Sequence, residues 1–269
     1  MDPQDIPVVI LAGGMGTRLR EQTEFMPKPL VPVGGRPILW HIMKIYGHYG
    51  YRRFVICLGY KGEMIKQFFW HYRLFNTDCT INLRHSERIT FHHEGKAEDW
   101  EITLADTGAK TMTGARIKRI EQYIDTQTFL LTYGDGVADV DVSAAAAFHR
   151  AHGRIATVTG VRPPARFGEL RVAGDQVVEF GEKPAGGTSM INGGFFVFDR
   201  KMFDYLSNDE NCTLEKDPLE RLAREGQLMV HSHRGFWQCM DTLRDMSLLN
   251  EYWESGKAPW KLWDDEPSG

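Results

Sequence analysis

Residues 8–30 read VVILAGGMGTRLREQTEFMPKPL, and this stretch decides the fold. An apolar, β-branched run at 8–11 stops at a glycine cluster within 13–16, which Thr17 and Arg18 follow. A strand that ends in glycines lets backbone N–H groups approach a polyanion closely, because no Cβ stands in the way. Arg18, and Lys28 between two prolines, add the cations that a triphosphate needs. The stretch therefore predicts a phosphate-binding loop after a buried strand.

Two commoner glycine loops do not fit this spacing. A P-loop ends in Gly-Lys-Ser/Thr, whereas Gly16 is followed by Thr17 and Arg18. The dinucleotide fingerprint needs a third glycine, but this chain has Leu19 at that position. The fingerprint also needs an acidic residue about twenty positions later, where residues 33–35 read VGG. The bland alternative is a plain strand-to-helix turn with an isolated arginine. The glycines, the Thr-Arg pair and the Pro-Lys-Pro together argue against that alternative.

Strand and helix patterns alternate along the rest of the chain. Buried strands separated by helices predict an α/β, Rossmann-like, mostly parallel sheet flanked by helices. Alternation at 169–180 around Gly174 and Asp175 predicts a small antiparallel addition, and the C-terminal end is expected to be helical. We expect helices at 37–50, 63–75, 114–124, 143–152, 217–225 and 242–254, strands at 53–58, 80–83, 129–132, 155–161, 193–198 and 228–233, and an irregular stretch at 85–114.

The predicted topology brings two loops to one edge of the sheet. Ligands of open α/β sheets bind at the carboxyl ends of the strands. The glycine loop at 13–18 and the turn at 133–135 (YGD) both follow predicted strands. We therefore treat the two loops as parts of one site.

Composition excludes several classes of protein. The chain has 269 residues, of which 42% are hydrophobic, so it can bury a full core. Its net charge of −4 argues against a nucleic-acid partner. Its apolar runs are far shorter than the ~20 residues that span a membrane, and no signal-peptide pattern opens the chain, so the cytosol is the expected compartment. The four scattered cysteines indicate neither a zinc site nor a disulfide framework.

The glycine loop with its Pro-Lys-Pro resembles the signature of the nucleotide-sugar pyrophosphorylases. Blocks such as RPILWHIMK, LGYKG, YGDGVAD, INGGFFV and MDTLRD extend the resemblance over nearly the whole chain. They are most similar to the members that transfer a cytidylyl group from CTP to glucose 1-phosphate. The resemblance implies one nucleotidyltransferase domain over 1–269, with a nucleotide-binding part at about 7–160 and a sugar-phosphate-binding part at about 161–255. It also implies a homo-oligomer.

The implied reaction is an in-line attack of the sugar phosphate on the α-phosphorus, without a covalent enzyme intermediate. Such chemistry needs positioning and charge neutralisation. The resemblance assigns Asp135 and Asp241 as the ligands of a Mg²⁺ ion, which keeps room for water and phosphate oxygens. Taken singly, the first would be a turn residue and the second a helix N-cap. Asp139 and Asp141 are expected in the exposed turn and helix cap that follow.

The remaining site residues fall into two groups. Arg18 is expected to neutralise the triphosphate, and Lys28 to bridge the phosphates near the reacting α-phosphorus. The resemblance assigns Lys183 to the sugar 1-phosphate. Glu182 and Asn192 then fit the sugar hydroxyls, with Gly193 allowing close approach, while Trp237 belongs either to the sugar pocket or to the core. The nucleotide-binding positions, besides Arg18 and Lys28, are Leu11, Ala12, Gly13, Gly14, Met15, Gly16, Thr17, Thr111, Arg116 and Gly134.

Base preference is the most open point. Cytosine offers acceptors at O2 and N3 and a donor at N4, so its pocket needs an arginine-type donor and a carbonyl acceptor. Arg116 and Thr111 match the nucleotide-contacting positions of the family. The alternatives are the same reaction with UTP, dTTP or another hexose 1-phosphate, and a non-catalytic regulatory subunit of the same fold. A nicotinamide-dependent oxidoreductase is disfavoured by the missing fingerprint.

Overall fold

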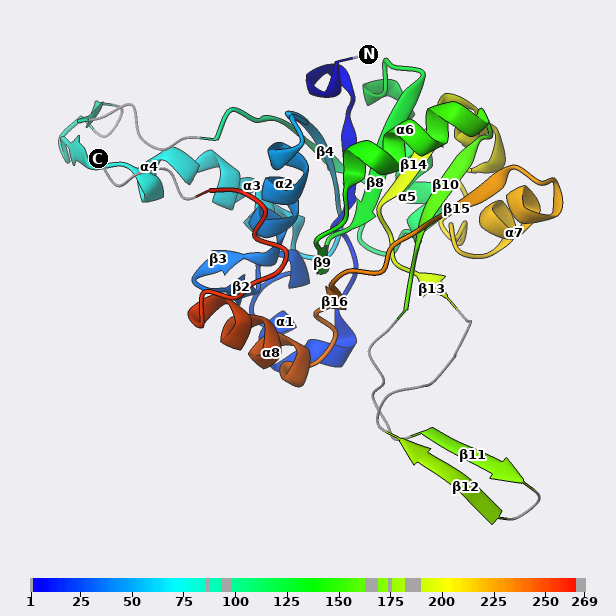
Figure 1. The fold of residues 1–269 in the computed structure, drawn as a ribbon. Coiled ribbons are helices and arrows are strands. Elements are labelled where there is room, and N and C mark those ends of the chain that lie inside the picture. The colour runs from blue at the N-terminus through cyan, green and yellow to red at the C-terminus, as the bar shows by residue number, and fades with distance from the viewer. Residues whose placement is uncertain are drawn as a thin grey trace.

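An eight-stranded sheet forms the centre of the computed structural model, which describes residues 2–85, 88–92, 98–162, 169–173, 176–181 and 190–264 (Figure 1). β1 is flanked by parallel neighbours on both sides, and a further parallel strand completes that half of the sheet. The mostly parallel sheet is therefore confirmed. In spatial order the strands are β13 (Ile191–Asn192), β10 (Ala156–Val161), β14 (Phe196–Asp199), β8 (Thr128–Tyr133), β1 (Val8–Leu11), β4 (Arg53–Leu58) and β7 (Glu101–Asp106), with β15 (Leu228–Ser232) also paired to β10.

The side chains of β1 alternate between two hydrophobic cores, one on each face of the sheet. Val8 and Ile10 belong to one core, and Val9 and Leu11 belong to the other. Because successive side chains of a strand point to opposite faces, an apolar run without polar positions is what a doubly covered sheet requires. The first core includes residues of α2 (Ile38–His48), α3 (Gly62–Trp70), α6 (Val142–His152) and α8 (Leu243–Glu254), and the second includes residues of α5 (Thr113–Arg119) and α7 (Asp217–Arg224).

The helices follow the predicted ones with two differences. The helix expected at 63–75 is divided at His71 into α3 and α4 (Tyr72–Asn76). The helix expected at 114–124 ends at Arg119, and a 3-10 helix, Glu121–Tyr123, follows it. The other short helices are α1 (Arg20–Thr23) and the 3-10 helices Pro3–Asp5, Thr17–Leu19, Lys28–Leu30 and Arg200–Tyr205. Within the described residues, no helix is long and apolar enough to cross a membrane.

Two features of the sheet differ from, or add to, the expectations. The irregular stretch predicted at 85–114 is wrong in part, because β6 (Ile89–Phe91) and β7 lie there, and β7 pairs with β4 in parallel. β7 is a half-buried strand at the end of the sheet, so its apolar residues alternate with Glu101, Thr103 and Asp106 and give no continuous apolar run. β14 was expected as a strand, and the structure adds that it runs antiparallel to both β8 and β10.

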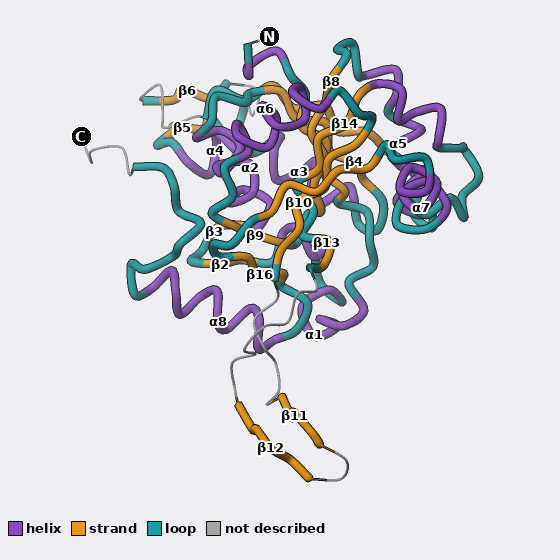
Figure 2. The backbone as a smooth tube through the Cα atoms, turned by 45° about the vertical axis from the view of Figure 1, so that its right-hand side comes forward, coloured by secondary structure: helices purple, strands orange, loops and turns teal. Residues whose placement is uncertain are grey.

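Four two-stranded antiparallel sheets complete the fold. β11 (Glu169–Ala173) and β12 (Gln176–Gly181) pair as predicted and lie away from the body in both views (Figures 1 and 2), whereas the predicted turn at Gly174 and Asp175 lies outside the described residues. The helical C-terminal end is confirmed by α8, after which Trp260 is buried. The other pairs are β2 (Pro32–Val33) with β3 (Arg36–Pro37), β5 (Cys79–Ile81) with β6 (Ile89–Phe91), and β9 (Gly136–Ala138) with β16 (Trp237–Cys239).

Candidate active site

The glycine loop leaves β1 at the carboxyl edge of the sheet. Gly16 has a φ of 61°, in the left-handed region, and a Cβ built there would come within 2.7 Å of the Thr23 side chain and 3.2 Å of the Lys28 Cβ. Gly14 has open space where a Cβ would stand. Glycine at 16 therefore permits both the turn and the close approach of the segment that carries Lys28.

Lys28 projects from the 3-10 helix that its flanking prolines start and restrain. Pro27 is the N-cap of this helix, and Pro29 lies in its first turn. The Lys28 side chain is almost fully buried, and its Nζ lies 2.6 Å from Asp135 Oδ2 and 2.7 Å from Asp241 Oδ1. Burial by itself would lower the pKa of Lys28, but the two carboxylates more than offset burial and raise that pKa above its ordinary value. Lys28 is therefore a charged bridge between two acidic side chains.

The pairing of β9 with β16 brings these two acidic residues together. Gly136 is opposite Cys239 in this antiparallel pair, and the Met240 N–H donates to the Asp135 carbonyl at 2.8 Å. Asp135 and Asp241 therefore flank the same end of the small sheet. Neither strand was predicted, because three-residue strands are too short to show a hydrophobic period.

Asp245 holds the backbone of Asp241 in place. Its buried carboxylate accepts hydrogen bonds from the N–H groups of Asp241 at 3.1 Å and Thr242 at 2.9 Å. It also accepts from the Thr242 hydroxyl at 2.8 Å and the Gln238 amide at 3.0 Å. Thr242 is the N-cap of α8 in a capping box with Asp245, so the alternative that Asp241 caps this helix is wrong. The carboxylate of Asp241 is left to face Lys28.

Arg18 reaches the carboxylate pair from the solvent side. Its side chain is 72% exposed, and Nη1 lies 2.9 Å from Asp241 Oδ2. Partial burial of Asp241 raises its pKa, but Lys28 and then Arg18 outweigh burial, so that its pKa lies below the ordinary value. Two cations and two carboxylates thus form one cluster. In the part of the chain that the structure describes, no group of three or more His, Cys, Asp or Glu side chains could hold a metal, so an ion at the pair needs further ligands from elsewhere.

Two cavities meet at this cluster. The first, of about 320 Å³, contains nearly all the residues predicted to bind the nucleotide. Met15 is the exception among the loop positions: it does not line this cavity and is 60% exposed. The second, of about 280 Å³, contains Asn192, Gly193 and Trp237. Both cavities are lined by Arg18, Tyr133, Asp135 and Asp241.

Arg116 binds backbone carbonyl groups at the carboxyl ends of several strands. Its Nη1 donates to Leu58 O at 2.9 Å and Gly108 O at 2.7 Å, and its Nη2 donates to Gly13 O at 3.0 Å. A Cβ on Gly13 would collide with this guanidinium at 2.3 Å. The side chain is buried under the glycine loop and lines the first cavity. Recognition of the base by Arg116 stays a prediction, and its contacts indicate that it also positions the loop.

A chain of polar side chains leads from Asn192 in the second cavity to Glu215, which the sequence did not indicate. Asn192 donates to the Tyr133 hydroxyl at 3.0 Å, and that hydroxyl donates to Glu215 Oε1 at 2.7 Å. Trp237 donates from Nε1 to Gly193 O at 2.8 Å, which aligns its ring with the cavity wall. Tyr133 directly precedes the Gly-Asp turn and could have been noticed there, whereas nothing near Glu215 pointed to the site. Glu182 and Lys183 lie outside the described residues.

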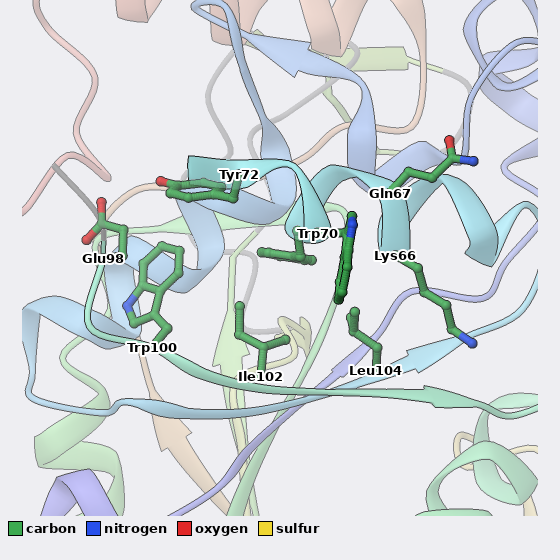
Figure 3. A pocket seen from close by; sticks show the side chains of 9 residues that line it. Lys66, Gln67, Trp70, Tyr72, Glu98, Trp100, Ile102 and Leu104 are labelled. Carbon is green, nitrogen blue, oxygen red and sulfur yellow. The ribbon is translucent and has the colours of Figure 1, made fainter. Parts of the chain in front are cut away.

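A larger apolar cavity, of about 580 Å³, lies between α3, α4 and β7. Figure 3 shows the rings of Trp70 and Trp100 beside Ile102 and Leu104, with Lys66 and Glu98 at the margins. This cavity shares no lining residue with the two cavities at the carboxylate pair. We assign the chemistry to the smaller cavities because they contain the glycine loop and the charged cluster.

The chain is similar to known proteins over nearly its whole length. A family model described as nucleotidyl transferase matches residues 7–256. Glucose-1-phosphate cytidylyltransferase of Salmonella typhimurium is 52% identical over 95% of this chain and 99% of that protein. UTP–glucose-1-phosphate uridylyltransferase of Synechocystis sp. is 24% identical over 92% of this chain and 61% of that protein. The crystal structure of HddC from Yersinia pseudotuberculosis complexed with GMP-PN has the same fold, with a TM-score of 0.65 at 22% identity over 92% of this chain and 99% of that chain.

Proposed function

The chain belongs to the nucleotidyl transferase family, and from this premise we propose that it transfers a cytidylyl group from CTP to glucose 1-phosphate, giving CDP-glucose and pyrophosphate. The observation that carries the proposal is the meeting of two cavities at one charged cluster. One cavity contains the glycine loop, and the other contains Asn192, Gly193 and Trp237. A nucleotide in the first and a sugar phosphate in the second would meet beside Lys28, Asp135 and Asp241.

Charge explains why cations are concentrated at this junction. CTP and a sugar phosphate bring together roughly six negative charges. Two like unit charges 4 Å apart repel by about 4 kcal/mol at an effective dielectric constant of about 20, which is typical near a protein surface. Arg18 is accessible to the triphosphate, since most of its side chain is exposed. Lys28 is buried at the junction, where its ammonium can stabilise charge that develops on the α-phosphate during in-line attack. The reaction forms one P–O bond and breaks another, so no residue need act as a nucleophile.

The carboxylate pair fits a divalent ion. Asp135 Oδ2 and Asp241 Oδ1 converge on a single cation in this structure, the Lys28 ammonium. Two carboxylates with phosphate oxygens and water are a usual Mg²⁺ environment, so we propose that these residues hold Mg²⁺. Mg²⁺ bound there would neutralise charge on the α-phosphate and orient the phosphates.

The sugar-phosphate side is supported by geometry and by the resemblance. Asn192, Gly193 and Trp237 line the second cavity. We keep Lys183 as the partner of the sugar 1-phosphate and Glu182 as a partner of sugar hydroxyls. Tyr133 is added to this set, because its hydroxyl binds Asn192 and its ring lines both cavities.

CTP is favoured over UTP and dTTP by degree of similarity. The cytidylyl-transferring relative is 52% identical to this chain, while the uridylyl-transferring relative is 24% identical. A non-catalytic subunit is disfavoured because Arg18, Lys28, Asp135 and Asp241 are all present.

We also propose that the chain forms a homo-oligomer. Light scattering on the purified chain, which measures the molar mass in solution, tests this proposal.

A pyrophosphate-release screen tests the proposed function. The full chain is incubated with Mg²⁺, each of CTP, UTP, dTTP and GTP in turn, and a panel of hexose 1-phosphates. We expect the fastest release with CTP and glucose 1-phosphate. Faster release with another nucleotide would replace the cytidylyl assignment while keeping the family reaction, and no release with any pair would support the regulatory-subunit alternative.

A further inference from the structure

The Asp135–Asp241 pair is already neutralised by cations of its own chain. Lys28 Nζ contacts one oxygen of each carboxylate, at 2.6 and 2.7 Å, and Arg18 contacts the second oxygen of Asp241 at 2.9 Å. Two negative charges therefore face two positive charges within direct contact. Both oxygens of Asp241 and one of Asp135 are engaged in these ion pairs.

Lys28 is the better placed of the two cations to oppose a metal ion. Its side chain is 11% exposed, and the backbone that carries it is restrained by prolines on both sides. The two oxygens that it contacts are the ones that converge on one point, which is where a divalent ion would need them. An ammonium and a divalent ion repel each other strongly at contact distance in a buried setting, because little solvent screens them.

We propose that Lys28 and a divalent cation exclude one another at the Asp135–Asp241 pair, so that the ion binds tightly only when a polyphosphate has drawn the Lys28 ammonium away. This inference rests on the metal site of the proposed function. The first cavity lies directly beside Lys28 and contains the glycine loop, whose backbone suits phosphate oxygens. The four-carbon stem of lysine is flexible enough for its head group to change partner without moving the backbone.

The exclusion couples the two ligands. A polyphosphate that removes Lys28 from the carboxylates raises affinity for the ion, and by linkage the ion raises affinity for the polyphosphate by the same factor. The chain is thereby expected to take up metal and nucleotide together and to bind free metal weakly.

Binding of free Mn²⁺ to the full chain tests the proposal without any turnover. The wild type is compared with Lys28→Met and Lys28→Gln by electron paramagnetic resonance of unbound Mn²⁺ and by the rise in Tm with added Mg²⁺. Lys66→Met is the matched control, because it removes the same charge from an exposed position on α3. We expect both Lys28 variants to bind Mn²⁺ about tenfold tighter than the wild type, a typical coupling between linked sites, and Lys66→Met to match the wild type.

Several outcomes would overturn the exclusion. Equal Mn²⁺ affinity in the wild type and the Lys28 variants overturns it, as does an equal gain in Lys66→Met, which would reveal a net-charge effect. If Lys28→Met does not fold, Lys28→Gln replaces it in the comparison, because glutamine keeps a hydrogen-bond donor. Tight binding of free Mn²⁺ by the wild type overturns the proposal regardless of how the variants behave. Adding Asp135→Asn to Lys28→Met should remove the gain, and a gain that persists places the ion elsewhere.

A parallel activity assay separates this inference from the proposed function. Pyrophosphate release from CTP and glucose 1-phosphate is measured for the wild type and for Asp135→Asn. Mg²⁺-dependent release that Asp135→Asn abolishes, together with unchanged Mn²⁺ binding in the Lys28 variants, overturns the exclusion and leaves the function standing. Absence of release in the wild type overturns the function, while tighter Mn²⁺ binding in the Lys28 variants would still support the exclusion.

Discussion

Replacing Asp245 with alanine tests how the chain holds Asp241 toward Lys28. Asp245 is 8% exposed, and its carboxylate accepts hydrogen bonds from the Asp241 and Thr242 backbones, the Thr242 hydroxyl and the Gln238 amide. Alanine removes every one of these acceptors. It also removes half of the capping box that starts α8. The pairing of β16 with β9 and the ion pairs of Asp241 with Lys28 and Arg18 then remain to hold the turn that presents Asp241.

The magnitude follows from the contacts that are lost. Thr242 stays as the N-cap of α8, because its hydroxyl still accepts from the backbone N–H of residue 245. Each donor that stays buried without a partner costs about 1–3 kcal/mol. Because the donors share one acceptor group, these costs do not add, and we expect a total loss of about 3 kcal/mol. Residues that orient a metal ligand typically change metal affinity or activity by about 10–100-fold, so kcat should fall and the Mg²⁺ concentration for half-maximal rate should rise by that order.

A second capping aspartate supplies the control. Asp141 is the N-cap of α6, where its exposed side chain accepts from the Ala144 N–H at 2.8 Å. Asp141→Ala should cost about 1 kcal/mol in urea denaturation and leave kcat and the Mg²⁺ requirement unchanged. Asp245→Asn keeps one acceptor oxygen, and a turned Gln238 amide can pair with its new donor, so this variant should recover most of the activity. The reasoning fails if Asp245→Ala is destabilised yet has the kcat and Mg²⁺ requirement of the wild type.

Four further outcomes are expected. Asp135→Asn and Asp241→Asn should each abolish Mg²⁺-dependent pyrophosphate release, and full activity in either would remove that residue from the metal site. Lys183→Ala should raise the KM for the sugar phosphate and leave the KM for CTP nearly unchanged, whereas a larger effect on CTP would place it in the other cavity. Arg116→Ala should impair CTP more than UTP if the side chain recognises the base, and both equally if it only positions the glycine loop. Burial lowers the pKa of His41 to about 4, whereas its pKa in the unfolded chain is about 6.5. The contribution of neutral His41 to the free energy of unfolding is therefore complete above about pH 6.5 and is lost as the pH falls toward 4. Urea denaturation at pH 7 and pH 5 should show that His41→Gln reduces the pH-dependent change in unfolding free energy by about 2 kcal/mol.

The sequence predicted well those helices and strands whose pattern of apolar and polar residues matches the pattern of buried and exposed positions in the structure. Val8 to Leu11 is apolar at every position because both faces of β1 are covered, so the run identifies a central strand. Asp141 was expected to cap a helix, and it is the N-cap of α6. β7 was missed because an edge strand with alternating polar residues, beside a polar stretch, resembles a loop. β9 and β16 were missed because each is three residues long and acquires its structure only from the other.

The sequence by itself determined which residues are available for the proposed chemistry: a glycine loop, two cations, two aspartates and the family to which they point. Those properties are local, because the conformational freedom of glycine, the restraint of proline and the type of each side chain do not depend on distant residues. Only the tertiary structure decided that Lys28 lies between Asp135 and Asp241, which are 107 and 213 positions away from it. That contact depends on strand pairing and on the Asp245 network, and hydrogen bonds between distant segments leave no periodic trace in the chain. The same reason explains Arg116, whose charge was evident in the sequence but whose partners, the carbonyl groups of strand ends, exist only once the sheet has formed.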